Sequence, residues 1–305
     1  MEMIGTAIAF HRYSAQEDLE TKIQNCKEKE LGAIEFGWNL CTLGPIGKTN
    51  KTNSRKQLFF PSKEQVSLVL EKSKNFRRSI HAPYIISLTT DNKNILTSSK
   101  RYITRVSTLG DLLQASHFTF HAGGVTREGA SQLTRALREI LEKFEKKNIN
   151  ILPSIEVAGK TRNFGGFTEV LQVASDVGCL FTWDFAHDYV RGGYITTEEA
   201  ILARLEKIDN SSLNLKNHYL PIHISGIVGG PFGEKYHTSL NKSDIPWQLF
   251  LSVLKEQNFL DKVTIICESK LKNLQDEQII IDFLKSKEIV KKWFPKKSRL
   301  DAFLS

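Results

Sequence analysis

The chain has 305 residues, of which 40 % are hydrophobic and 25 % are charged. These proportions are typical of a folded globular protein and exclude a disordered or fibrous chain. We expect one large domain, because α/β barrels of ~250 residues fold as a single unit. The first residues lack the basic start and apolar centre of a signal peptide, and no apolar run approaches the ~18 residues of a membrane span. We therefore expect a cytoplasmic protein that makes no membrane contact.

Much of the net charge of +8 lies in two basic runs, at 48–56 and 291–299. A positive charge of this size favours encounter with polyanions. A solvated lysine-rich surface would have the same composition, so charge alone does not establish nucleic-acid binding. The four cysteines form no close pairs, which indicates neither a disulfide framework nor a zinc knuckle. We expect a catalytic domain at 1–290 and a basic C-terminal tail at 291–305.

Apolar segments alternate with amphipathic segments along the chain. The apolar segments predict strands at 4–10 and 32–36, and further strands that end at 81, 121, 156, 184, 223 and 268. Apolar residues at helical spacing predict helices at 15–29, 63–73, 94–115, 126–147, 167–177, 196–208, 247–257 and 277–286. Thr196 and Glu199 resemble a capping box at the start of one helix. Eight strands that alternate with eight helices predict a (β/α)8 TIM barrel, with a doubly wound open sheet as the alternative.

Six of the predicted strands end in a residue that can bind a metal ion, namely His81, His121, Glu156, Asp184, His223 and Glu268. All strands of a TIM barrel end at the same rim, so these side chains are expected to converge. An open sheet would leave several of them too far apart to share an ion. Imidazole and carboxylate ligands without thiolates suit zinc, manganese or iron.

Three imidazoles and three carboxylates exceed what one ion needs. His81 and His121 could hold one ion, and Asp184, His223 and Glu268 a second, with Glu156 as a bridge. His187 and His237 could hold a third ion, with Glu234 as a candidate carboxylate, although the glycine-rich segment 229–237 is expected to be a flexible loop. Paired ions activate water and clamp a phosphoryl group during its displacement. The alternative for any single histidine is a structural role. We expect His117 to be a bonded core residue and His218 to be structural at the opposite rim, and we leave open whether His11 is a ligand.

The ordered set of strand ends resembles the endonuclease IV family of apurinic/apyrimidinic endonucleases, within the xylose-isomerase-like barrels, and the chain would be a divergent member of it. The resemblance is carried by His81-Ala-Pro-Tyr84, Phe120-His121-Ala-Gly-Gly, Glu156-Val-Ala-Gly159, Asp184-Phe-Ala-His187, Pro221-Ile-His223 and Cys267-Glu268-Ser. It implies a DNA-repair hydrolase that incises damaged double-stranded DNA 5′ to an abasic site and leaves a 3′-hydroxyl.

The resemblance also implies which residues form the site. They would bind two or three divalent metal ions, with zinc as the expected metal and manganese as the alternative. His81, His121 and Glu156 would bind one ion, Glu156, Asp184, His223 and Glu268 a second, and His187 and His237 a third. Glu156 and Glu268 would be the catalytic carboxylates. Tyr84 would enter the DNA at the lesion, and Lys48, Lys51 and Arg55 in the loop at 39–56 would contact the DNA. We expect the protein to act as a monomer.

Three positions depart from the family pattern. Lys235 stands where the family has an aspartate two residues before its last histidine, Ser87 replaces an asparagine, and Glu156 lacks the Asn-Thr that follows it in the family. The lost carboxylate affects the third ion and leaves the other two intact. A sugar isomerase or epimerase is the first alternative, with one ion and with Glu156 and Glu268 exchanging protons on carbon. A DNA-binding relative of weak activity is the second. A single-ion isomerase does not need His81 and His121, so these two residues favour the endonuclease.

Overall fold

The computed structural model describes residues 4–8, 16–37, 63–213, 215, 218–269 and 275–292. Eight strands close into a barrel in the order β1-β10-β7-β6-β5-β4-β3-β2, and every neighbouring pair is parallel. These strands are β1 (Ile4–Ile8), β2 (Ala33–Gly37), β3 (Arg77–His81), β4 (His117–Phe120), β5 (Leu152–Glu156), β6 (Leu180–Asp184), β7 (Leu220–Ile224) and β10 (Val263–Cys267). The predicted (β/α)8 barrel is confirmed as a single domain.

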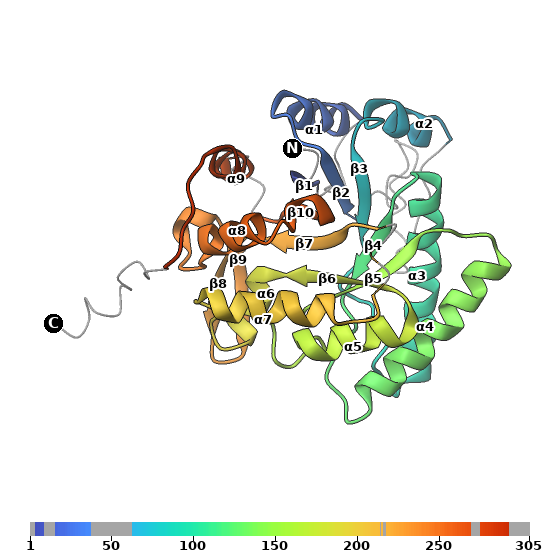
Figure 1. The fold of residues 1–305 in the computed structure, drawn as a ribbon. Helices are drawn as coiled ribbons and strands as arrows, with labels where there is room; N and C mark the ends of the chain where they lie inside the picture. The colour runs from blue at the N-terminus through green and yellow to red at the C-terminus, as the bar shows by residue number, and fades with distance from the viewer. Residues whose placement is uncertain are drawn as a thin grey trace.

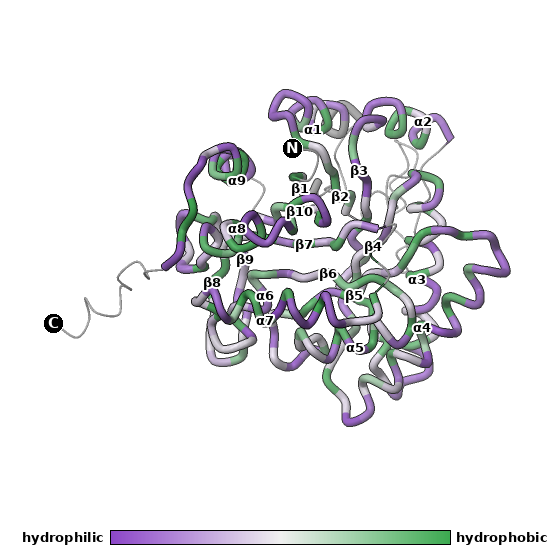
Figure 2. The backbone as a smooth tube through the Cα atoms, viewed as in Figure 1, coloured by the Kyte–Doolittle hydropathy of each residue, from purple (hydrophilic) through white to green (hydrophobic). Residues whose placement is uncertain are grey.

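Helices form the outer layer around this barrel (Figure 1). They are α1 (Gln16–Glu28), α2 (Lys63–Lys72), α3 (Lys93–Leu112), α4 (Gly129–Lys146), α5 (Phe167–Val177), α7 (Glu198–Asp209), α8 (Trp247–Glu256) and α9 (Gln275–Lys285). Hydrophilic and hydrophobic residues alternate along these helices (Figure 2). In α4 the predicted stripe faces the core, since Leu133, Leu137, Ile140 and Phe144 are buried. Each helix thus covers the barrel with one apolar face.

The structure adds elements that the sequence pattern did not predict. A short helix, α6 (Phe185–Arg191), follows β6 directly, and β8 (Gly226–Gly230) pairs with β9 (Gly233–Thr238) as an antiparallel ribbon. Short 3-10 helices occupy Leu240–Lys242 and Leu260–Lys262. The expectation of a flexible loop at 229–237 was therefore wrong. Its order comes from backbone pairing within the ribbon and from a bridge between Lys160 and Gly233.

Some predicted boundaries move by one residue. His121 and Glu268 lie directly after β4 and β10 rather than inside them. The cap of α7 is Thr197, whose side chain accepts a hydrogen bond from the Ala200 N–H at 3.2 Å, so the capping box at Thr196 was wrong. The backbone of Thr197 is extended while that of the next residue is helical, which is the geometry of an N-cap.

Three parts of the sequence analysis lie outside the described residues. These are His11, the basic run at 48–56 and the tail beyond residue 292, so the boundary at residue 290 stays a prediction. Within the described part of the chain, no helix combines the length and apolar character that crossing a membrane requires.

A cluster of aromatic rings packs the side of the barrel that carries β6 and α8. Phe185 and Phe250 stack with their ring centroids 4.0 Å apart, and Trp183 meets Phe250 edge to face at 5.1 Å. All three side chains are fully buried. Because Phe185 follows Asp184 directly, this packing fixes the backbone at the end of β6.

We predict that Phe250→Ala lowers the free energy of unfolding by ~3–5 kcal/mol, since it removes a buried ring and leaves a cavity. Equilibrium denaturation in urea measures this change. Gln248→Ala, at an exposed position of the same helix, should change stability by less than ~0.5 kcal/mol. Equal effects of the two substitutions would show that the cluster does not stabilise the barrel.

Candidate metal centre

The structure brings all eight predicted ligand residues to the rim at the carboxyl ends of the strands. Six of them end or directly follow barrel strands, while His187 lies in the first turn of α6 and His237 lies in β9. Parallel strands place their ends at one rim, so residues that are far apart in sequence become neighbours.

Glu156 is the carboxylate on which the imidazoles converge. Its Oε2 lies 3.0 Å from His81 Nε2 and 3.1 Å from His121 Nε2. Its Oε1 lies 3.3 Å from His223 Nδ1 and 3.5 Å from His187 Nδ1. Glu156 is fully buried, and each of its oxygens faces a different pair of imidazoles. This arrangement suits a carboxylate that bridges two ions.

Four groups of side chains among the described residues offer ligand atoms that lie within 4.8 Å of one another. Three of them consist of predicted ligands, namely His81, His121 and Glu156; Glu156, Asp184, His223 and Glu268; and Asp184, His187 and His237. The fourth contains Glu35 with His81, His223 and Glu268. Glu156 belongs to the first and second groups, and Asp184 belongs to the second and third. The geometry therefore matches three adjoining positions linked by shared carboxylates.

Several buried atoms in these groups have no hydrogen-bond partner. Both ring nitrogens of His121 and the Oδ2 of Asp184 are in this state. His121 Nε2 and Asp184 Oδ2 each approach another polar atom to 3.1 Å, but without hydrogen-bond alignment. Buried polar atoms without partners are costly, and metal ions in the respective ligand groups would give partners to one ring nitrogen of His121 and to Asp184 Oδ2. The residues present fit a metal site.

Backbone contacts orient the imidazoles toward the mouth. His81 Nδ1 lies 2.8 Å from the Ala82 carbonyl oxygen, and His187 Nδ1 lies 2.9 Å from that of Val157. A neutral imidazole that donates from Nδ1 leaves its Nε2 lone pair free for an ion. His187 Nε2 then faces His237 Nε2 at 3.0 Å.

The charges in the site are strongly coupled. Burial opposes the charge of Glu156, but the surrounding imidazoles lower the pKa of its carboxyl well below the ordinary value. Burial raises the pKa of Asp184 to about 6. Burial lowers the pKa of His121 to about 3, whereas Glu156 overcomes burial and raises the pKa of His81 to about 9. Metal ions could neutralise these carboxylates in place of protons, because a metal ion that binds to such a site displaces the protons of its ligands.

The β8–β9 ribbon brings His237 of the third group, together with Glu234, to α6. Glu234 Oε2 lies 3.5 Å from His187 Nε2, and Glu234 Oε1 lies 3.9 Å from His237 Nε2. Lys235 is exposed. Glu234, rather than the residue at position 235, is therefore the ribbon side chain that brings a carboxylate to His187 and His237.

Two glycines permit this close approach of the ribbon. The Glu234 N–H donates to the Gly159 carbonyl at 3.0 Å. A Cβ on Gly159 would lie 2.6 Å from His187 Cδ2 and 2.7 Å from Glu234 Cβ. Gly233 has a φ of +84°, and a Cβ there would lie 2.0 Å from the Gly159 oxygen. Larger residues at either position would push the ribbon away from His187.

Tyr84 and Ile85 follow His81 and project from the rim. Their exposed fractions are 70 % and 58 %, which is unusual for large apolar side chains. The Tyr84 ring stacks on the His121 ring with centroids 4.7 Å apart. The predicted DNA-contacting Lys48, Lys51 and Arg55 lie outside the described residues.

The sequence analysis missed Glu35, which is fully buried in β2 and contacts His223. Its pKa is lowered to about 2, because the His223 imidazole outweighs the opposing effect of burial. The signal was present, since a carboxylate inside the apolar run 33–36 is unusual. His117 is buried with Nδ1 at 2.8 Å from Ser116 Oγ, which agrees with the predicted core role.

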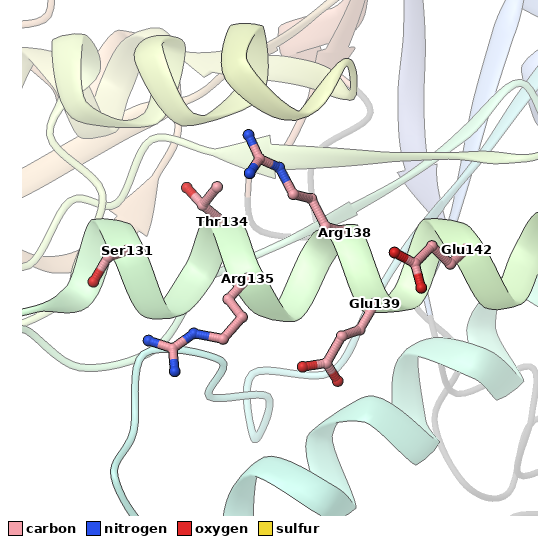
Figure 3. A pocket seen from close by; sticks show the side chains of 6 residues that line it. All are labelled: Ser131, Thr134, Arg135, Arg138, Glu139 and Glu142. Atoms are coloured by element: carbon pink, nitrogen blue, oxygen red, sulfur yellow. The ribbon is translucent and has the colours of Figure 1, made fainter.

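A shallow depression on the outer surface runs along α4 (Figure 3). It is lined by side chains of this one helix, and Arg135 and Arg138 leave the helix on different sides. None of the predicted site residues lines it.

Comparison with curated proteins finds two informative relatives. An uncharacterized protein of Methanocaldococcus jannaschii is 30 % identical over 199 residues, which cover 63 % of this chain and 71 % of that protein. A probable endonuclease 4 of Aquifex aeolicus is 24 % identical over 147 residues, which cover 45 % of this chain and 52 % of that protein.

Among solved structures, endonuclease IV from Thermus thermophilus superposes with a TM-score of 0.69 at 15 % identity, over 92 % of this chain and 98 % of that one. A D-tagatose 3-epimerase-like protein superposes with a TM-score of 0.66 at 16 % identity, over 92 % and 97 %. At these identities the likeness shows the shared fold. The family model described as xylose isomerase-like TIM barrel matches residues 33–287, so the chain belongs to the xylose isomerase-like TIM barrel family.

Proposed function

We propose that the protein is a metal-dependent endonuclease that hydrolyses the phosphodiester bond 5′ to abasic sites, or to related lesions, in double-stranded DNA. The observation that supports this most is the first ligand group. His81 and His121 converge on Glu156 beside a second complete group, and a single-ion enzyme would have no need of these two imidazoles. The similarity to the Aquifex endonuclease 4 points the same way.

The cofactors proposed are two or three divalent ions, with zinc preferred because imidazole and carboxylate ligands suit it. His81, His121 and Glu156 would hold one, and Glu156, Asp184, His223 and Glu268 another. The third would lie between His187 and His237, with Glu234 supplying the carboxylate that Lys235 cannot. Bound ions of this kind act as Lewis acids that activate water and stabilise charge on a phosphate.

The carboxylates of this chain have distinct tasks in the proposed reaction. Glu156 fixes the positions of imidazoles from the first and second groups through its two oxygens, with His81 and His121 beside one oxygen and His223 beside the other. Glu268 lies closer to solvent, with Oε1 at 3.4 Å from His223 Nδ1 and Oε2 at 3.9 Å from His237 Nδ1. From there it can accept a proton from the attacking water at the mouth.

Tyr84 supplies a surface for DNA at the edge of the site. Its ring is held by stacking on His121, and one face remains open to solvent. Aromatic rings of this kind stack on bases or fill the gap left by a missing base. Lys48, Lys51 and Arg55 remain proposed phosphate contacts that would strengthen binding at low salt.

A sugar epimerase is the second candidate, and the superposition with the D-tagatose 3-epimerase-like protein favours it. In that reaction Glu156 and Glu268 would move protons on a carbon atom while one ion orients the sugar oxygens. The epimerase would not depend on His81 and His121, whereas the endonuclease would.

The first test is incision of a labelled duplex that carries one abasic site. We expect cleavage on the 5′ side with a 3′-hydroxyl product, loss of cleavage with a strong chelator, and its recovery with zinc. An undamaged duplex is the control. Failure of metal-loaded protein to cut the damaged duplex, together with epimerisation of a ketohexose, would establish the second candidate instead.

Glu268→Gln should lower the incision rate by ~10²–10⁴-fold, because it removes a proton acceptor and an anionic ligand at the rim. Circular dichroism and the denaturation midpoint should stay close to those of the unchanged protein. Glu288→Gln, which alters an exposed carboxylate, is the matched control and should retain full activity. If Glu268→Gln cuts at the normal rate, Glu268 has no part in the reaction.

Gly159→Ala should remove the third ion selectively, because the added methyl group displaces Glu234 and His187. Elemental analysis of zinc-saturated protein should show one ion fewer per chain than in the unchanged protein. Gly124→Ala is the control, since a Cβ there meets only the Arg162 oxygen, at 3.9 Å. An unchanged zinc count in Gly159→Ala would contradict the assignment of the third ion to this group.

A further inference from the structure

We propose that Glu35 is a positioning residue that holds the His223 imidazole in the tautomer with hydrogen on Nε2, so that Nδ1 is directed at the metal. This inference rests on the proposed metal function of the same site. It adds a residue that belongs to none of the three ligand groups assigned to ions above.

Both ring nitrogens of His223 face carboxylates, but different ones. Nδ1 lies 3.3 Å from Glu156 Oε1 and 3.4 Å from Glu268 Oε1, which belong with His223 to one ligand group. Nε2 lies 3.3 Å from Glu35 Oε1 and 3.4 Å from Glu35 Oε2. An ion held between Nδ1, Glu156 and Glu268 takes the lone pair of Nδ1. The imidazole hydrogen then stays on Nε2, where Glu35 accepts it.

Glu35 is itself held as an ionised acceptor. Ser79 Oγ donates to Glu35 Oε2 at 3.0 Å, and Thr119 Oγ1 donates to the same oxygen at 3.3 Å. Among the ion pairs of the described residues, His223 is the partner of Glu35. These contacts fix the Glu35 carboxylate as an acceptor for the N–H of His223, the imidazole that lies beside it.

The surroundings of Glu35 form a polar layer inside the barrel, below the metal groups. Thr119 Oγ1 lies 3.3 Å from Thr182 Oγ1, which lies 2.6 Å from Ser154 Oγ. TIM barrels ordinarily fill this interior with branched apolar side chains. A buried polar layer lowers stability unless its polar atoms have hydrogen-bond partners. The orientation of His223 explains why such a layer is present here.

The alternative role for Glu35 is that of a metal ligand. Ligand atoms within 4.8 Å of one another are also offered by a group that consists of Glu35, His81, His223 and Glu268. That arrangement needs His223 Nε2 to face the ion. It would turn His223 Nδ1 away from the ion shared with Glu156 and Glu268, so the geometry favours the positioning role.

The test compares zinc binding and imidazole tautomers in the full chain. Zinc affinity is measured by competition with a chromophoric chelator, and the number of ions at saturation by elemental analysis. Glu35→Gln should lower the affinity for one zinc ion by ~10–100-fold. This is the usual effect of removing a carboxylate that hydrogen-bonds to a ligating histidine. The number bound at saturating zinc should not change. Ser79→Ala, which removes a hydroxyl from Glu35 without touching His223, should weaken binding less.

Nitrogen-15 spectra of the zinc-loaded, unsubstituted protein give a readout that does not depend on a variant folding. In these spectra His223 should show a zinc-bound Nδ1 and a protonated Nε2. In a second measurement, Glu35→Gln should make exchange of the Nε2 proton with solvent faster. Zinc on His223 Nε2, unchanged zinc affinity in Glu35→Gln, or the loss of one ion at saturating zinc would each overturn the proposal.

Incision of DNA is scored separately. Zinc binding that depends on Glu35 in a protein that does not cut abasic DNA would refute the endonuclease and leave this inference standing. An unsubstituted protein that binds no zinc would contradict both.

Discussion

The site depends on one buried negative charge, the carboxylate of Glu156, which is shared among four imidazoles. Two of them lie beside each oxygen, at 3.0 to 3.5 Å. In a fully buried position such a charge is tolerated only with close partners. Three of the four imidazoles are in turn held from behind, His81 and His187 by backbone carbonyls and His223 by Glu35. The buried carboxylate and the imidazoles around it therefore position one another.

Barrel closure makes this arrangement available from short pieces of sequence. Each barrel strand contributes its end to one rim, and residues as far apart as Glu35 and His223, 188 positions in sequence, come into contact. The ribbon formed by β8 and β9 adds residues that no barrel strand could supply. Gly159 and Gly233 let that ribbon approach closely enough for Glu234 to stand beside His187 and His237.

The barrel and most of the site could be predicted because their signals are local. Alternating apolar and amphipathic segments indicate strands and helices, and a ligand-type residue at a strand end is visible in one short window. The ordering of 229–237 could not be predicted, since it depends on Lys160 and Gly159 in a distant loop. The short helix α6 was missed because its residues are buried all round and show no amphipathic period. Glu35 was overlooked because its partner is far away in the sequence.

The central claim is that these converging side chains hold a cluster of ions that share carboxylates. The most direct measurement is X-ray diffraction from crystals of zinc-loaded protein, with anomalous differences collected on both sides of the zinc absorption edge. We expect one peak between His81, His121 and Glu156, a second between Glu156, Asp184, His223 and Glu268, and a third beside His187 and His237. A single peak away from His81 and His121, or no peak at this rim, would contradict the claim.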